Sequence, residues 1–266
     1  MRHFIYAHWP LFFGLYGGVV LSLVVIGISA EQGWLSYIPL ATAVLLILVF
    51  YLLATLWSAH QLYDTNGINP HHILFDMGRI QIGDTFAFID VGYRRRALAL
   101  SRRLTTGRII VLDVYNPQWT TSKALVRLRT RMPTSPADPR LSFREASVDM
   151  LPLPDKSVPA VILCQIVSEF WQHGDRLALL QEINRILTPN GRLLLAERTR
   201  SQTNWLVMGP AAFTLKTEQE WKQLLQQAGF IVRRTQERSG LIQCFRADKP
   251  TTAEAHQLAL ELAFDT

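Results

Sequence analysis

Two long uncharged segments open the chain, at Pro10–Ala30 and Trp34–Ser58. Each has about the 20 apolar residues that an α-helix needs to cross a bilayer. The connection between them, Glu31–Gly33, holds the only Asp, Glu, Lys or Arg between positions 4 and 63, and it is short enough for a tight reversal. This pattern predicts a transmembrane helical hairpin over residues 1–62.

Aromatic residues gather at the ends of both segments, where amphipathic rings prefer the headgroup layer. They are Trp9, Trp34, Tyr37, Trp57 and Tyr63. Arg2 precedes the first segment and a cationic domain follows the second, whereas the connection has no Lys or Arg. Since cytoplasmic loops carry an excess of Lys and Arg, we expect a multi-pass protein of the cell membrane whose soluble domain is cytoplasmic.

An alternative interpretation makes residues 1–30 a cleaved signal peptide, which would still leave one spanning helix and a cytoplasmic domain. Gly14 and Gly18 form a GxxxG pattern, which can let helices, including those of a protein partner, approach closely. Glycines are also common in such helices without this role.

After a polar linker at 63–75, apolar runs alternate with segments of helical pattern up to residue 250. The expected strands are Phe86–Asp90, Arg108–Val114, Leu141–Ala146, Ala160–Val167, Arg192–Glu197, Ile231–Glu237 and Leu241–Ala247. The expected helices are Arg95–Leu104, Thr120–Met132, Asp175–Leu187 and Thr217–Ala228, the last with a capping box. This alternation predicts an α/β domain over residues 76–250, with a parallel sheet flanked by helices. A tail at 251–266, which could form a helix, follows it.

The turn after the first strand carries the candidate chemistry. Gly92 follows an acid, Asp90, and a second acid, Asp113, comes about 20 positions later, which is the spacing of a nucleotide-binding βαβ unit. Such loops usually have three glycines, but here Arg94 and Arg96 take the other two positions. Glycine allows φ > 0 and close approach to a ligand, and an arginine at the same position threatens both. The sequence therefore predicts the βαβ fold more strongly than it predicts cofactor binding.

Charge and cysteine content restrict the partners. A net charge of +6 suits an anionic partner, either phospholipid headgroups or nucleic acid. Cys164 and Cys244 lie in apolar strand-like runs without CxxC spacing, so we expect buried thiols. The histidines show no ligand spacing, and the sequence predicts no metal site.

Three motifs follow one another in a family order: LPLPDKS at 151–157, QEINRILTPNG at 181–191 with LLLAE after it, and AGF at 228–230. With them the chain resembles the class I S-adenosylmethionine-dependent methyltransferases, most closely the small-molecule, type 11-like group, here with a degenerate glycine-rich loop. The resemblance covers about residues 76–250. It implies a Rossmann-like seven-stranded sheet with helices on both faces, whose last two strands form an antiparallel hairpin, preceded in this chain by the two transmembrane helices.

The resemblance also implies a cofactor, S-adenosylmethionine, and the residues that contact it. Asp90 and Gly92 would lie at its methionine end, Asp113 on the ribose hydroxyls, Ser147 and Val148 beside the adenine, and Gln165 facing cofactor and acceptor. Asp90 could instead only cap the next helix. The arginines 94–96 could be a solvated helix start, or they could clamp an anion. No catalytic residue is transferred, and Glu169 and His173 are more often surface residues than bases.

Two functions remain open. The first is a membrane-anchored methyltransferase acting on a small or amphiphilic acceptor, lipid- or quinone-like, that reaches it from the lipid bilayer. The second is an inactive methyltransferase-like domain that serves as a membrane-anchored binding or assembly subunit, which Arg94 and Arg96 support. Action on nucleic acid is disfavoured, because residues 165–168 read QIVS where amino-methylating enzymes have Asn/Asp-Pro-Pro-Tyr.

Overall fold

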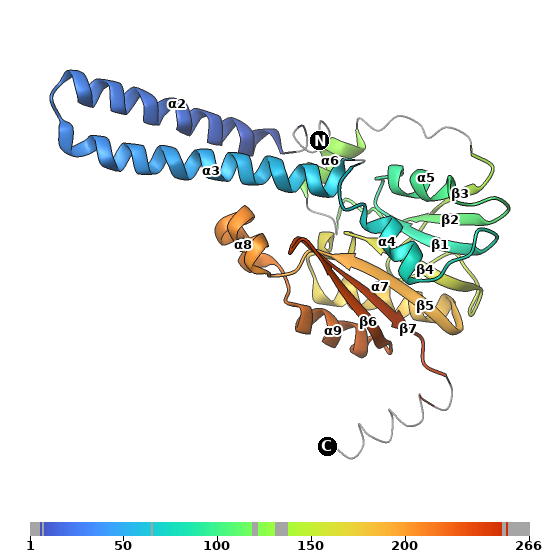
Figure 1. Cartoon of the computed structure of the whole chain (residues 1–266). Helices are drawn as coiled ribbons and strands as arrows, with labels where there is room; N and C mark the ends of the chain where they lie inside the picture. Colours follow the sequence, from blue (N-terminus) through green and yellow to red (C-terminus); the bar gives the residue numbers. More distant parts are fainter. Residues whose placement is uncertain are drawn as a thin grey trace, which may run out of the picture.

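The computed structural model describes residue 6 and residues 8–64, 66–118, 122–130, 138–251 and 254. A long helical hairpin projects from an α/β domain (Figure 1). The predicted tail at 251–266 lies almost wholly outside the described residues. The seven-stranded sheet and the two apolar N-terminal helices confirm the predicted fold class.

The hairpin consists of α2 (Trp9–Glu31), the short helix η1 (Leu35–Tyr37) and α3 (Ile38–Tyr63). By length and composition both long helices are able to cross a membrane, and few of their residues are buried, unlike those of a core helix in a soluble protein. A Cβ on Gly18 would lie 2.9 Å from a methyl of Leu48 on α3, whereas one on Gly14 would meet nothing within 4 Å. Only one glycine of the pair therefore lies against the neighbouring helix.

The sheet has the strand order β3-β2-β1-β4-β5-β7-β6. Its strands are β1 (Thr85–Asp90), β2 (Arg108–Asp113), β3 (Leu141–Glu145), β4 (Val158–Cys164), β5 (Leu187–Glu197), β6 (Ile231–Arg238) and β7 (Ile242–Asp248). Strands β1 to β5 are parallel, and β7 is antiparallel to both β5 and β6. The predicted C-terminal hairpin is thereby confirmed.

Helices cover both faces of the sheet because the central strands are apolar on both sides. On one face the core includes residues of α6 (Lys123–Arg129), α7 (His173–Ile186) and α9 (Glu218–Gln227). On the other it includes residues of α4 (Pro70–Met77) and α5 (Arg95–Ser101). The capping box predicted at the start of α9 is present between Thr217 and Glu220.

Two features differ from the expected organisation. Leu74 is buried in the same core as the sheet, so the segment predicted as a linker, 63–75, is partly packed and contains the start of α4. Leu62, at the end of the predicted hairpin, belongs to the same core. The chain between β5 and α9 forms two elements that the pattern did not predict, α8 (Gln202–Met208) and η3 (Gly209–Thr214).

Candidate active site at the carboxyl edge of the sheet

The carboxyl ends of the parallel strands bring the candidate residues together. Asp90 ends β1, Asp113 ends β2, Cys164 ends β4 and Glu197 ends β5, and the register pairs Asp90 with Asp113 directly. Ligands of open α/β sheets bind at this edge, outside the carboxyl ends of the strands. The edge is therefore the candidate site.

Asp90 faces the backbone of its own turn. Its carboxylate accepts hydrogen bonds from the backbone N–H groups of Val91 (2.9 Å), Tyr93 (3.0 Å) and Arg94 (2.8 Å). Burial of this carboxyl, which is 1% exposed, raises its pKa. In this arrangement Asp90 holds the turn before α5. The role of Asp90 toward a cofactor stays a prediction.

Arg129 of α6 occupies the space between Gly92 and Asp113. Its Nη1 donates to both carboxylate oxygens of Asp113, at 3.0 and 2.9 Å, and to the carbonyl oxygen of Val91, at 2.8 Å. The guanidinium also lies 4.0 Å from the ring centroid of Tyr115. A Cβ on Gly92, which has φ +101°, would be 2.4 Å from the same Nη1. The glycine turn and the acid thus form a cradle that holds a planar cation.

The other arginines of the turn point in different directions. Arg96 donates to the carbonyl oxygen of Cys164 and to Oε1 of Gln165, and it lies 5.3 Å from the ring centroid of Tyr93. It therefore joins α5 to the end of β4. Arg94 has φ +29° and lies over the ring of Phe143 on β3. The predicted alternatives for these arginines, a solvated helix start or a shared anion clamp, do not describe either contact.

The two residues predicted beside the adenine differ in exposure. Ser147 is exposed just beyond the end of β3, which pairs with β2 at Asp113 and Glu145. Val148 is 0% exposed and belongs to the core. Its side chain packs inward, so its backbone is the part that a ligand could reach. Both residues remain predictions as cofactor contacts.

A buried carboxylate organises the loop after β4. Glu197 is 0% exposed and accepts hydrogen bonds from the backbone N–H groups of Ile166 (2.9 Å) and Val167 (2.8 Å) and from the hydroxyl of Ser168 (2.8 Å). Burial raises its pKa. These bonds fix the short helix η2 (Val167–Glu169), which carries Glu169 to the site.

Glu169 is half-buried and interacts with Glu197 of β5, Arg96 of α5 and Ser122, which precedes α6. Burial, and next the charge of Glu197, raises its pKa to about 7, while Arg96 and a hydrogen bond from Ser122 lower it. Its charge in turn raises the pKa of Tyr93, to which burial contributes most. A carboxyl that titrates near neutrality at a candidate site is suited to accept a proton.

Sequence reasoning missed two of these residues. Arg129 stands in a predicted helix, but no spacing rule indicates that it reaches Asp113. The sequence favours a surface position for Glu169, because the hydrogen bonds between Glu197 and the loop cannot be predicted from residue spacing. A signal for Glu197 was present, since a charged residue that ends a buried apolar strand needs partners.

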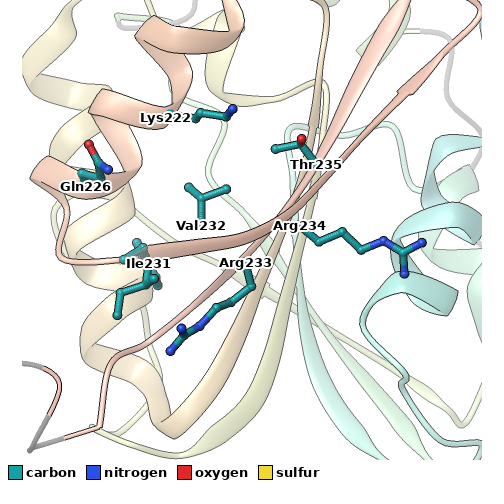
Figure 2. A pocket seen from close by; sticks show the side chains of 8 residues that line it. Lys222, Gln226, Ile231, Val232, Arg233, Arg234 and Thr235 are labelled. Atoms are coloured by element: carbon teal, nitrogen blue, oxygen red, sulfur yellow. The ribbon is translucent and has the colours of Figure 1, made fainter.

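Two cavities lie away from this edge. One, of about 340 Å³, lies between α9 and β6, where Figure 2 shows Lys222 and Gln226 on the helix and Ile231–Thr235 on the strand. The other, of about 350 Å³, is lined by Met150–Pro154, Glu182 and Arg185. Neither includes Asp113 or Glu169.

Comparisons with known proteins bear on the fold of the domain. A family model described as a methyltransferase domain matches residues 90–195. The chain is similar to a SAM-dependent methyltransferase from Aquifex aeolicus, with 20% identity over 72% of this chain and 93% of that one and a TM-score of 0.53. It is similar to human N-acetylserotonin methyltransferase in complex with SAM, with 17% identity, coverage of 77% and 56%, and a TM-score of 0.50.

The chain is also similar to the [4+2]-cyclase SpnF, with 16% identity, coverage of 68% and 80%, and a TM-score of 0.52. The search of curated proteins found no match. The sheet therefore has the Rossmann-like fold of the class I SAM-dependent methyltransferases, and the family match together with these neighbours supports S-adenosylmethionine as its cofactor. The cyclase shows that the fold alone does not fix the reaction.

Proposed function

We propose that the protein is a membrane-anchored methyltransferase that uses S-adenosylmethionine to methylate a hydroxyl group of an amphiphilic, lipid- or quinone-like acceptor. The observation that carries this proposal is Glu169, a half-buried carboxyl with a pKa near 7 on the loop after β4. It lies at the same edge as the cradle formed by Gly92 and Asp113.

The cofactor would supply an electrophilic methyl group on a sulfonium. Methyl transfer to a hydroxyl forms an O–C bond, breaks the C–S bond and releases one proton. Glu169 is suited to take that proton, because its pKa lies near the working pH. Arg96, which lowers the pKa of Glu169, would favour the charged carboxylate that accepts the proton. Positioning of the two reactants would supply much of the remaining acceleration.

The residues present fit the cofactor if the side chain of Arg129 withdraws. The cradle now holds a planar cation against a carboxylate and an aromatic ring. The same carboxylate, Asp113, could accept hydrogen bonds from two ribose hydroxyls, and the glycine leaves room for the ligand. Arg129 is long and reaches the cradle from the last residue of α6. Rotation of its side chain would open the cradle by breaking its hydrogen bonds to Asp113 and Val91.

The acceptor class follows from the position of the hairpin. The side chains of α2 and α3 are largely apolar and exposed, which suits lipid around them. Leu62, near the end of α3, is buried in the same core as Cys164 at the end of β4. An acceptor that resides in the bilayer would therefore have a short path to this edge of the sheet.

The second candidate function is a domain that binds without catalysing. The specific observation in its favour is the ion pair between Arg129 and Asp113. Through this pair a side chain of the protein itself fills the cradle and binds its carboxylate. In that case the arginine would be a permanent replacement for the ligand, and the protein would serve as a membrane-anchored binding or assembly subunit.

The experiment that separates these functions uses the full chain in lipid nanodiscs with methyl-labelled S-adenosylmethionine and an alkylated hydroquinone as the acceptor probe. Transfer of label into the lipid extract, lost in Glu169→Gln and retained in Glu218→Gln on the surface of α9, would support the enzyme. The same assay is repeated with lipid extracts from membranes that contain the native acceptor, which tests acceptors other than hydroquinones. Absence of labelled lipid from both sources would favour the binding subunit.

A further inference from the structure

The element between β5 and α9, α8 with η3, carries an exposed apolar surface. No Asp, Glu, Lys or Arg occurs from Ser201 to Leu215. Trp205 is 49% exposed, Leu206 is 51% exposed and Phe213 is 64% exposed, whereas Val207 faces the core. Large apolar side chains that gather on one element mark an interaction surface rather than ordinary surface.

The base of this element is held firmly to the domain. Asn204 is 0% exposed and donates to the carbonyl oxygens of Thr199 and Leu241, both at 2.9 Å. Arg200 donates to the carbonyl oxygens of Phe213 and Leu215, both at 3.1 Å. The apolar surface is therefore presented by a fixed structure.

The element also contacts the hairpin at a defined depth. A Cβ on Gly209, which has φ +58°, would lie 2.8 Å from the hydroxyl oxygen of Tyr51 on α3. Figure 1 shows α8 beside α3, on the side of the domain from which the hairpin projects. Tyr51 precedes Trp57 in α3 by about 9 Å, at about 1.5 Å per residue. If Trp57 marks the headgroup layer, the contact lies on the hydrocarbon side of it.

Positive charge borders the same surface. Arg200 and Lys216 flank the uncharged segment at its base, and the backbone N–H of Arg200 donates to the carbonyl of Lys216 at 2.9 Å. Apolar and aromatic residues that enter the acyl boundary by about 5–10 Å, with cations at the level of the headgroups, are the pattern of interfacial membrane segments.

We propose that α8 and η3 form a second membrane-contact surface, which inserts Trp205, Leu206 and Phe213 into the cytoplasmic leaflet beside α3. The partner is the lipid bilayer itself, argued from the continuity of the surface with α3 and from the bordering cations. This inference rests on the membrane anchoring in the proposed function. With this surface inserted, the domain would contact the bilayer directly in addition to being attached through α2 and α3.

The test uses the full chain in liposomes with one added cysteine, labelled with an environment-sensitive fluorophore. Cys164 and Cys244 are each 0% exposed, so the added thiol is the reactive one. The variants are Leu206→Cys and Phe213→Cys, with Leu46→Cys on α3 as the membrane reference and Gln223→Cys on α9 as the exposed control. Lipids brominated near the headgroup or deep in the acyl chain serve as quenchers.

Shallow quenchers should lower the fluorescence at positions 206 and 213 by about twofold or more and leave position 223 unchanged, because an interfacial segment stays in the outer part of the acyl region. Quenching at Leu46→Cys with none at either α8–η3 position would overturn the inference and leave the hairpin intact. This outcome includes the case in which another protein covers the surface. If Leu46→Cys is not quenched either, the anchoring in the proposed function fails as well.

Discussion

The two halves of the candidate site treat their carboxylates differently. At the ends of β1 and β2, Asp90 is bound by three backbone N–H groups and Asp113 is paired with Arg129. At the ends of β4 and β5, Glu197 is satisfied by the loop, but Glu169 has a pKa raised to about 7 by burial. The half proposed to bind the cofactor, called the cofactor half below, is occupied by Arg129 of the chain itself. The half proposed to bind the acceptor retains Glu169, a group that can change its charge near neutral pH.

Acids at one edge of a sheet can therefore have different roles, either fixing the backbone or exchanging a proton. Asp90 and Glu197 fix the backbone through their hydrogen bonds, although burial raises the pKa of each. Burial raises the pKa of Glu169 to about 7, against a hydrogen bond from Ser122 that lowers it. Glu169 is therefore suited to exchange a proton near neutral pH, and Glu197 fixes the loop that carries it.

The largest effect is expected from Glu169→Gln, which removes the proposed base and keeps the shape of the side chain. We expect methyl transfer to the hydroquinone probe to fall about 100-fold or more, the usual contribution of a general base. In the wild type, kcat/KM should rise with pH below about 7 and then level off, because the active form is the carboxylate. A variant with an unchanged pH profile would show that Glu169 is not the titrating group.

The same raised pKa has the opposite effect on stability. Folded Glu169 retains its proton up to about pH 7, whereas its ordinary pKa is 4.5. The folded state therefore binds more protons than the unfolded state between these values, and the contribution of Glu169 to stability falls as pH rises through this window. Glu169→Gln should flatten that part of the curve of unfolding free energy against pH, measured by denaturation in detergent.

The next effect concerns the acid of the cofactor half. Asp113→Asn would remove the charge-assisted hydrogen bonds that we propose between Asp113 and the ribose. We expect S-adenosylmethionine to bind about tenfold to a hundredfold more weakly, which corresponds to about 1.5–3 kcal/mol. Asp155→Asn is a matched control, because Asp155 also pairs with an arginine, Arg185, but lies outside the site. Equal loss in both variants would contradict a specific role for Asp113.

A smaller effect with the opposite sign is expected from Arg129→Ala. In the proposed function its side chain must leave the cradle before the cofactor enters. Its removal should therefore tighten binding by up to about fivefold, which corresponds to the roughly 1 kcal/mol expected for a partly exposed ion pair. Arg103→Ala, which removes the partner of Asp76 at the surface, should leave the affinity unchanged. Weaker binding in Arg129→Ala would indicate that the arginine contacts the cofactor instead of competing with it.

The smallest effect separates backbone strain from side-chain contact at Arg94. Its φ of +29° disfavours a residue with a Cβ, while its guanidinium lies over Phe143. Both Arg94→Gly and Arg94→Ala lose the ring contact, but only glycine relieves the strain. Arg94→Gly should therefore be more stable than Arg94→Ala by about 0.5–1 kcal/mol, after the backbone entropy of glycine is included. Equal stability would show that the turn is unstrained.

The fold could be predicted from the sequence because its signals are local or periodic. The apolar runs gave the strands, and the Thr217–Glu220 pattern marked the start of α9. The domain boundary was harder to predict, since Leu62 and Leu74 join the core through contacts far along the chain. For the site, strand-end positions indicated Asp90 and Asp113, but the side chain that fills the cradle comes from α6. Only the packing of the folded chain brings Arg129 to Asp113.

The most direct test of the account is calorimetric titration of S-adenosylmethionine into the full chain in nanodiscs, for the wild type, Arg129→Ala and Asp113→Asn. The account predicts binding to the wild type, tighter binding to Arg129→Ala and weaker binding to Asp113→Asn. Absence of binding heat in all three proteins at two temperatures, while circular dichroism shows an intact fold, would contradict it. The domain would then not bind the cofactor even when the side chain of Arg129 is removed, and the binding-subunit function would be favoured.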